Sequence, residues 1–127
     1  MRKAKKDKAQ LTEKEEEVML YFWNHGELRV KDVVDLMPEP KPHVNTISTF
    51  VRLLEQKGYL GHNSHGNTYT YYPLRPMEEY RRNTFRNIVR NLFNNNYMTA
   101  VSAFVEDEQL NADELRQLLD MVEKRNK

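Results

Sequence analysis

The sequence contains no cysteine and no long apolar run. Without cysteine, the chain offers neither a disulfide framework nor a thiolate metal site. No apolar stretch reaches the roughly 20 residues that a transmembrane helix needs. The basic N-terminus is not followed by the apolar segment of a signal peptide. We therefore expect a cytoplasmic protein that is not inserted in a membrane.

Catalytic and metal-binding patterns are also missing. The acidic run Glu15–Glu17 lies in the first turn of a predicted helix, where the helix dipole accounts for it. The run Glu106–Glu108 has no glycine-rich loop, nucleophile or base near it in sequence. His62 and His65 have no nearby carboxylate or cysteine that would complete a zinc site. We expect no enzymatic activity, no metal and no cofactor.

Charge is divided unevenly along a chain whose net charge is only +1. The opening "MRKAKKDKAQ" is strongly basic, whereas "VEDEQLNADEL" carries five acids and no base. We interpret residues 1–10 as a flexible basic arm, which could add salt-sensitive phosphate contacts to a neighbouring DNA-binding domain.

Two helices are expected in the first third of the chain. Thr12 and Glu15 have the spacing of a capping box, and Gly26 marks the end of that helix. The segment "ELRV" is short and β-tolerant, so we expect a brief strand or bridge there. A short helix over "KDVVDLM" would turn Val33, Val34, Leu36 and Met37 inward, and the proline-rich "PEPKP" cannot continue it.

A longer helix and a hairpin follow. Ile47, Phe50, Val51 and Leu54 repeat with helical periodicity and predict a helix over about residues 44–57. Beyond Gly58, strands are expected near residues 59–63 and 68–73, with "NSHGN" as the hairpin tip.

The C-terminal third predicts three amphipathic helices. A domain of about 70 residues has little spare core on which to bury them. We favour packing on a second copy of the chain, because symmetric dimers are the commonest oligomers; folding back on the same chain is the alternative. The candidate dimerisation residues are Phe85, Ile88, Val89, Leu92, Val101, Phe104, Leu115, Leu118, Leu119 and Val122.

This order of elements indicates a winged helix-turn-helix, in a mainly α protein with a small β-hairpin followed by C-terminal dimerisation helices. Such folds place the second helix in the DNA major groove. Asn, Arg, Ser and Thr on the outer face of the second long helix suit base and phosphate contacts. The candidate DNA-binding residues are His43, Asn45, Thr46, Ser48, Thr49 and Arg52 on the helix, and His62, Asn63, Ser64, His65 and Asn67 on the hairpin.

The alternative is a winged-helix protein-interaction module that does not bind DNA. A helix of small polar residues is also simply a solvated helix, and the hairpin lacks the Lys or Arg that DNA-contacting wings often carry. The two hypotheses differ in salt dependence, which is steep only for DNA binding.

Three stretches together carry a resemblance to a known family. "LTEKEEEVMLYFWNHGELRVKDVVDLM", "NTISTFVRLLEQKGYL" and "YTYYPL" strongly resemble the penicillinase-repressor (BlaI/MecI) family of bacterial regulators. The resemblance covers roughly residues 11–123. It implies a winged helix-turn-helix DNA-binding domain, here residues 11–75, and a helical dimerisation region, here residues 76–127.

The resemblance also implies a function. Members of this family are homodimeric repressors of palindromic operators that control genes such as those for β-lactamase. In β-lactam systems a membrane-bound sensor peptidase triggers cleavage of the repressor in its dimerisation helices, before a phenylalanine. The matching bond here is Ala103–Phe104, although family members have Asn where this chain has Ala103. Copper-sensing relatives use a cysteine-rich tail, so the lack of cysteine argues against that branch.

Overall fold

The computed structural model describes residues 10–126, so all but the last residue of the predicted basic arm lies outside the described residues. The chain divides into two compact units, the first ending at Thr84 and the second beginning at Phe85. This division falls inside a helix, beyond the boundary expected between residues 75 and 76. The predicted domain limits therefore stay a prediction.

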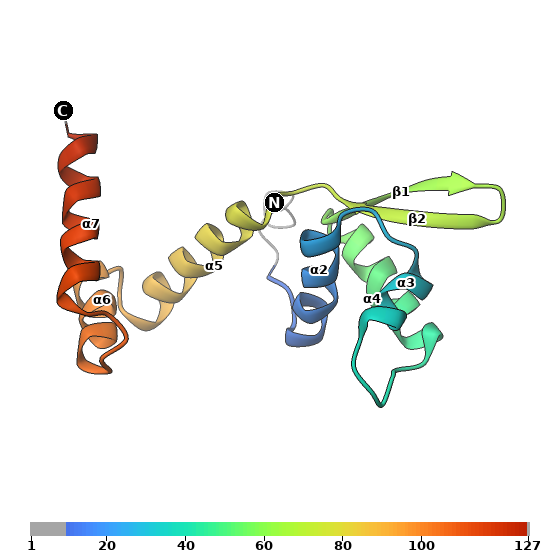
Figure 1. The fold of residues 1–127 in the computed structure, drawn as a ribbon, viewed down its shortest axis with the longest axis horizontal. Coiled ribbons are helices and arrows are strands. Elements are labelled where there is room, and N and C mark those ends of the chain that lie inside the picture. Colours follow the sequence, from blue (N-terminus) through green and yellow to red (C-terminus); the bar gives the residue numbers. More distant parts are fainter. Residues whose placement is uncertain (1–9, 127) are drawn as a thin grey trace. The chain divides into compact units, whose positions relative to one another are not determined.

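The first unit begins with the helix-turn-helix (Figure 1). Its helices are α2 (Glu13–His25), α3 (Val30–Leu36) and α4 (Val44–Gln56). The capping box expected at Thr12 and Glu15 is present, and α2 ends at Gly26 with a φ of 85°, which a residue without Cβ adopts readily. The short bridge expected in "ELRV" is confirmed as the pairing of Leu28 with Tyr71.

A two-stranded antiparallel hairpin completes the winged fold. Strand β1 (Leu60–His65) pairs with β2 (Thr68–Pro73), with His65 opposite Thr68. The turn therefore contains only Gly66 and Asn67, and Asn63 and Ser64 lie within β1 rather than in the tip. The expected five-residue tip was wrong because Gly66, at a φ of 67°, permits a tight two-residue turn.

The core of the first unit lies between the three helices and the base of the hairpin. Its largest fully buried side chains are Phe22, Met19, Leu54 and Leu60. Val33 and Val34 of α3 and Met37 just after it are buried as expected, but Leu36 is 44% exposed. The helical repeat places Leu36 on a different face from the three residues that reach the core.

A lysine that the sequence patterns did not single out holds the connection between α3 and α4. The Lys41 Nζ donates to the backbone carbonyls of Val34, Asp35 and Met37 at 3.3, 3.0 and 2.5 Å. These carbonyls lie at the C-terminal end of α3, where intrahelical partners run out and a positive charge is favourable. Lys41 thus ties the proline-rich segment back onto α3.

A partly buried ion pair links the beginning of α2 to the end of α4. Lys57 Nζ lies 2.6 Å from Glu15 Oε1, and Glu15 is buried. Burial raises the pKa of Glu15, but hydrogen bonds from Lys57 and the Thr12 backbone outweigh it, so the net pKa is below its ordinary value of 4.5. The pair therefore stabilises the fold above pH 4.5 and loses its contribution as the pH falls through the depressed pKa.

Replacing Glu15 by glutamine is expected to lower the free energy of unfolding by about 2 kcal/mol at pH 7, because the charge-assisted hydrogen bond between the Lys57 ammonium and the buried Glu15 carboxylate is lost. The difference between variant and wild type should shrink below pH 4.5, where the wild-type carboxylate is progressively protonated. Urea unfolding at pH 7 and pH 3 measures both effects. Glu13→Gln, at an exposed position in the same turn, is the control; equal losses for the two variants would contradict the prediction.

The second unit contains the remainder of α5 (Met77–Leu92), α6 (Tyr97–Glu106) and α7 (Ala112–Arg125). Val89 and Ala100 are its buried side chains, and the rings of Phe85 and Tyr97 meet edge-on with centroids 6.0 Å apart. Asn111 forms the expected capping box with Glu114. With so few buried side chains, these helices leave most of their apolar surface exposed.

Candidate nucleic-acid interface

The N-terminal end of α4 is organised by His43. The His43 Nδ1 accepts a hydrogen bond from the backbone N–H of Asn45 at 3.0 Å and so caps the helix. This leaves the Asn45 side chain exposed at the first turn, together with Thr46. The N-terminal end of such a helix is the part that usually enters the groove. The cap thus holds Asn45 and Thr46, two side chains of the kind that contact bases, at that end.

The outer face of α4 carries the predicted polar side chains. Thr49 Oγ1 donates to the Asn45 carbonyl at 3.1 Å, and Arg52 Nη1 donates to Ser48 Oγ at 2.8 Å. Both are one-turn contacts along the helix, so they orient the side chains without burying them. His43, Asn45, Thr46, Thr49 and Arg52 are exposed and Ser48 is half-buried. All six predicted helix residues are therefore at least partly accessible.

Glu55 is the only acidic residue of α4, and a histidine of the wing lies against it. His62 Nδ1 lies 2.5 Å from Glu55 Oε2, and the His62 ring stacks on Tyr69 with centroids 4.5 Å apart. The end of the helix is thereby joined to β1 by a polar contact. The pair has no periodic signature in the sequence, because its two residues are seven positions apart across a turn.

A second carboxylate, Glu27, holds the other face of the wing. It accepts hydrogen bonds from Thr70 Oγ1 and from Asn63 Nδ2, the latter at 2.9 Å, and lies 4.0 Å from His65. The hydrogen bonds from Thr70 and then Asn63 lower the pKa of Glu27. Asn63 and His65 thus have partners within the chain, whereas Ser64 and Asn67 are exposed near the turn. The bridge of Leu28 to Tyr71 brings Glu27 to this position.

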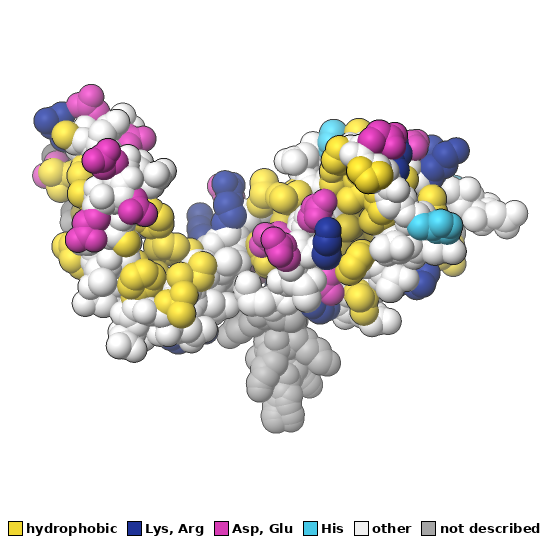
Figure 2. Space-filling model, turned by 90° about the horizontal axis from the view of Figure 1, so that it is seen from below, with side chains coloured by type: hydrophobic (Ala, Val, Ile, Leu, Met, Phe, Trp, Pro, Cys, Tyr) yellow, Lys and Arg dark blue, Asp and Glu magenta, His cyan; other side chains and the backbone are white. Residues whose placement is uncertain are grey.

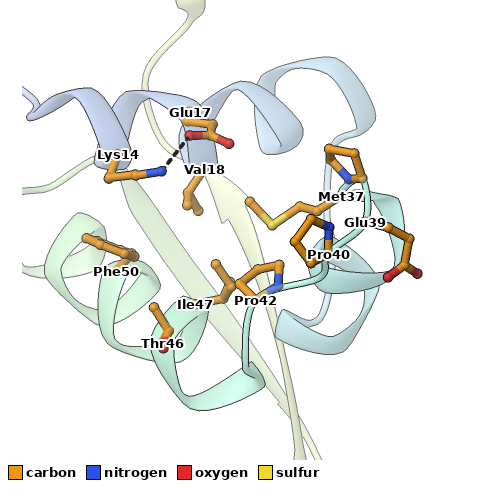
Figure 3. Close-up of a pocket in the computed structure, with 11 residues that line it drawn as sticks. Lys14, Glu17, Val18, Met37, Glu39, Pro40, Pro42, Thr46, Ile47 and Phe50 are labelled. Carbon is orange, nitrogen blue, oxygen red and sulfur yellow. Dashed lines mark ion pairs between the residues drawn. The ribbon is translucent and has the colours of Figure 1, made fainter.

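A small cavity lies behind α4, at the elbow of the helix-turn-helix (Figure 3). It measures about 290 Å³ and is enclosed by α2, the connection after α3, and α4. Val18, Met37 and Ile47 point toward its interior, and the ion pair of Lys14 with Glu17, at 3.6 Å, lies at its edge. The volume falls at the lower limit for small-molecule pockets. We interpret it as a packing gap.

The second unit presents exposed apolar side chains. Figure 2 shows hydrophobic side chains gathered on the surface of its helices. Met98 and Leu92 are each 75% exposed. Of the predicted dimerisation residues, Val89 is fully buried within the chain, Val101 and Leu115 are half-buried, and the others are exposed. The exposed ones are Phe85, Ile88, Leu92, Phe104, Leu118, Leu119 and Val122.

Two further observations concern the described residues, 10–126. They contain no group of three His, Cys, Asp or Glu side chains placed to hold a metal ion. None of their helices is both long and apolar enough to cross a membrane.

The helix-turn-helix, the two-stranded wing and the exposed polar face of α4 define a winged helix-turn-helix protein. Comparison with known proteins then gives the family. A family model described as "Penicillinase repressor" matches residues 11–124, and the chain belongs to that family.

Several relatives and one solved structure are similar to this chain. The penicillinase repressor of Bacillus licheniformis is 26% identical over 115 residues, 90% of each chain. The methicillin resistance regulatory protein MecI of Staphylococcus aureus is 23% identical over 117 residues, 91% of this chain and 95% of the relative. The solution structure of the DNA binding domain of the repressor BlaI has a TM-score of 0.49 at 29% identity. It covers 56% of this chain and 88% of that domain.

Proposed function

We propose that this protein is a sequence-specific DNA-binding transcriptional repressor that acts as a homodimer on a palindromic operator. The observation that carries the proposal is the outer face of α4. It is exposed, rich in hydrogen-bonding side chains and free of acids except for Glu55, which is paired with His62. Membership of the penicillinase repressor family supports the same function.

Binding would place α4 in the major groove, which is about 12 Å wide and admits one helix. Asn45 can pair with both the N6 and N7 groups of adenine, and Arg52 can pair with guanine in the same bidentate way. The hydroxyls of Thr46, Ser48 and Thr49 reach phosphates or base edges. The wing would lie against the sugar-phosphate backbone, with Ser64 and Asn67 nearest to it.

Dimerisation would use the exposed apolar side chains of α5, α6 and α7. A second copy of the chain is the partner that supplies a matching surface, because symmetric interfaces are self-complementary. Joining two winged units raises the effective concentration of the second unit at its half-site. Tight operator binding would then depend on the C-terminal helices, although they read no bases themselves.

Relief of repression would follow from proteolysis in the C-terminal helices. The candidate bond, Ala103–Phe104, lies inside α6. We propose that a membrane-bound sensor peptidase starts this cleavage in the cytoplasm on a signal such as a β-lactam. The names of the two relatives, penicillinase repressor and methicillin resistance regulatory protein, support an antibiotic signal.

The test is selection of genomic DNA fragments by the purified full-length protein, followed by footprinting of the tightest fragment across a salt series. We expect a protected two-fold-symmetric site with half-sites about one helical turn, roughly 34 Å, or a multiple apart. Affinity should fall steeply with salt. Retention without a preferred site, or none at physiological salt, would contradict the proposal and favour a winged-helix protein-interaction module without DNA binding.

Replacing Arg52 by alanine is expected to weaken operator binding by about 1–3 kcal/mol and to relax selectivity at one base position, because a bidentate contact to a base is lost. Gel-shift titration against the operator and its single-base variants measures both effects. Lys124→Ala, which removes one positive charge on α7 at a position exposed in the chain, is the control. Equal weakening across all single-base variants would show that Arg52 contacts only phosphate.

A further inference from the structure

Three aromatic side chains fix the first turn of α5 to the winged unit; we refer to Trp23, Tyr59 and Tyr80 as the aromatic seat. Tyr80 comes from α5 and is only 6% exposed. Its ring lies 5.4 Å from that of Trp23 on α2 and meets the ring of Tyr59 edge-on at 5.8 Å. All three residues belong to the first unit, which ends at Thr84.

Two hydrogen bonds hold this arrangement. The Tyr80 hydroxyl donates to Glu16 Oε2 at 3.0 Å, and Trp23 Nε1 donates to the backbone carbonyl of Arg75 at 2.8 Å. Burial and the hydrogen bond to Glu16 raise the pKa of Tyr80 to about 12, so the hydroxyl keeps its proton at neutral pH. Residues on both sides of the start of α5 are therefore tied to α2.

The Arg75 guanidinium adds a contact at the same place. It lies over the Tyr59 ring at 5.6 Å from the centroid, and it pairs with Glu79 at 3.6 Å. Turning α5 by one residue would rotate Tyr80 by about 100° and take it out of the seat. The start of α5 thus has one defined rotational setting on the winged unit.

Helix α5 continues from this seat to Leu92, past the division between the two units. A single copy of the chain needs no defined setting of α5 in order to expose α4. A dimer on two half-sites does need one, because its two recognition helices must meet grooves a fixed distance apart. The contacts that hold the start of α5 in the aromatic seat are therefore not needed for one winged unit to bind one half-site.

We propose that Tyr80 is a positioning residue that determines which half-site spacing the dimer accepts; this inference rests on the proposed function. Tyr80 is buried against Trp23 and Tyr59, so it acts through α5 and not by touching DNA. With the seat intact, the start of α5 has one rotation on its winged unit, and the dimer prefers one half-site spacing. With the ring removed, the first turn of α5 is released and several spacings become acceptable.

The experiment uses the full chain and duplexes that carry two copies of the footprinted half-site, separated by spacers that grow one base pair at a time. The dissociation constant for each duplex, and for a single half-site, is measured. We expect the wild type to prefer one spacing by about tenfold or more, because linked sites reward matched geometry. Tyr80→Ala should bring this preference below about threefold while binding to a single half-site stays within about twofold.

Two matched variants separate positioning from a general loss of structure. Tyr80→Phe keeps the ring in the seat and should retain the preferred spacing. Glu78→Ala, at an exposed position in the same turn, should behave like the wild type. Because Trp23 lies beside Tyr80, its fluorescence changes with the local contact; far-UV circular dichroism and urea unfolding therefore report whether each variant stays folded.

An insertion variant tests the inference if Tyr80→Ala proves unfolded. Inserting one alanine between Thr84 and Phe85 leaves the contacts within each unit intact and turns α5 by about 100° at the division. The preferred spacing should change. An unchanged preference in the insertion variant, or a folded Tyr80→Ala protein with wild-type spacing preference, would overturn the inference. Failure of the wild type to bind any operator would instead refute the proposed function.

Discussion

Replacing both Leu119 and Val122 by aspartate is expected to make the protein monomeric and to weaken its binding to a two-half-site operator by about a hundredfold or more. These side chains are 57% and 55% exposed on α7, so the substitutions leave the packing within the chain almost unchanged. Two carboxylates from each copy, four in all, would be buried in a symmetric interface, which is strongly unfavourable. Sedimentation equilibrium measures the oligomeric state, and gel-shift titration measures the affinity.

The control for this variant is Gln117→Asp, which adds negative charge to the same helix. By helical spacing, Gln117 lies opposite the stripe formed by Leu118, Leu119 and Val122. It should leave the dimer and the operator affinity unchanged. Binding to a single half-site should be equal in all of these proteins. A double variant that stays dimeric and keeps full affinity would contradict the proposed interface.

The second large effect is expected in the core of the winged unit. Phe22→Ala should lower the free energy of unfolding by about 4 kcal/mol, because a fully buried aromatic ring is replaced by a cavity. That loss is a large part of the total stability of a small domain. Urea unfolding followed by circular dichroism gives the value.

Leu20→Ala is the matched control for Phe22→Ala. Leu20 lies on the same helix but is 39% exposed, so its truncation should cost well under half as much. Equal losses at the two positions would contradict the assignment of Phe22 to the core. Because both residues belong to α2 and neither is on the outer face of α4, any operator binding lost by Phe22→Ala should follow its fraction of unfolded protein.

Local signals predicted most of the helices correctly. Thr12 with Glu15 and Asn111 with Glu114 act over three residues, so the sequence alone identifies them as capping boxes. Periodicity was less exact in α3, where a short helix presents only one narrow face and Leu36 fell outside it. The hairpin turn was placed too broadly, because its length depends on strand pairing and not on composition.

The exposed face of α4 followed from its spacing, whereas the environment of the wing did not. Glu27 and Asn63 are far apart in sequence and meet only through the fold. The same holds for Trp23 and the Arg75 carbonyl, which are joined by a hydrogen bond just before α5 begins. Helical periodicity indicates which residues face inward and which face outward. It carries no information on contacts between side chains that are far apart in sequence.

The position of Ala103 inside α6 bears on the proposed relief of repression by proteolysis. The Ala103 carbonyl accepts a hydrogen bond from the backbone N–H of Asp107 at 3.0 Å. The backbone on both sides of the candidate bond is therefore helical. A peptidase that holds its substrate extended acts only on the fraction of molecules in which α6 has locally opened. If the chain is cut there, local opening of α6 limits the rate of cleavage. A substitution that stabilises α6 would then slow cleavage without changing the residues of the cleaved bond.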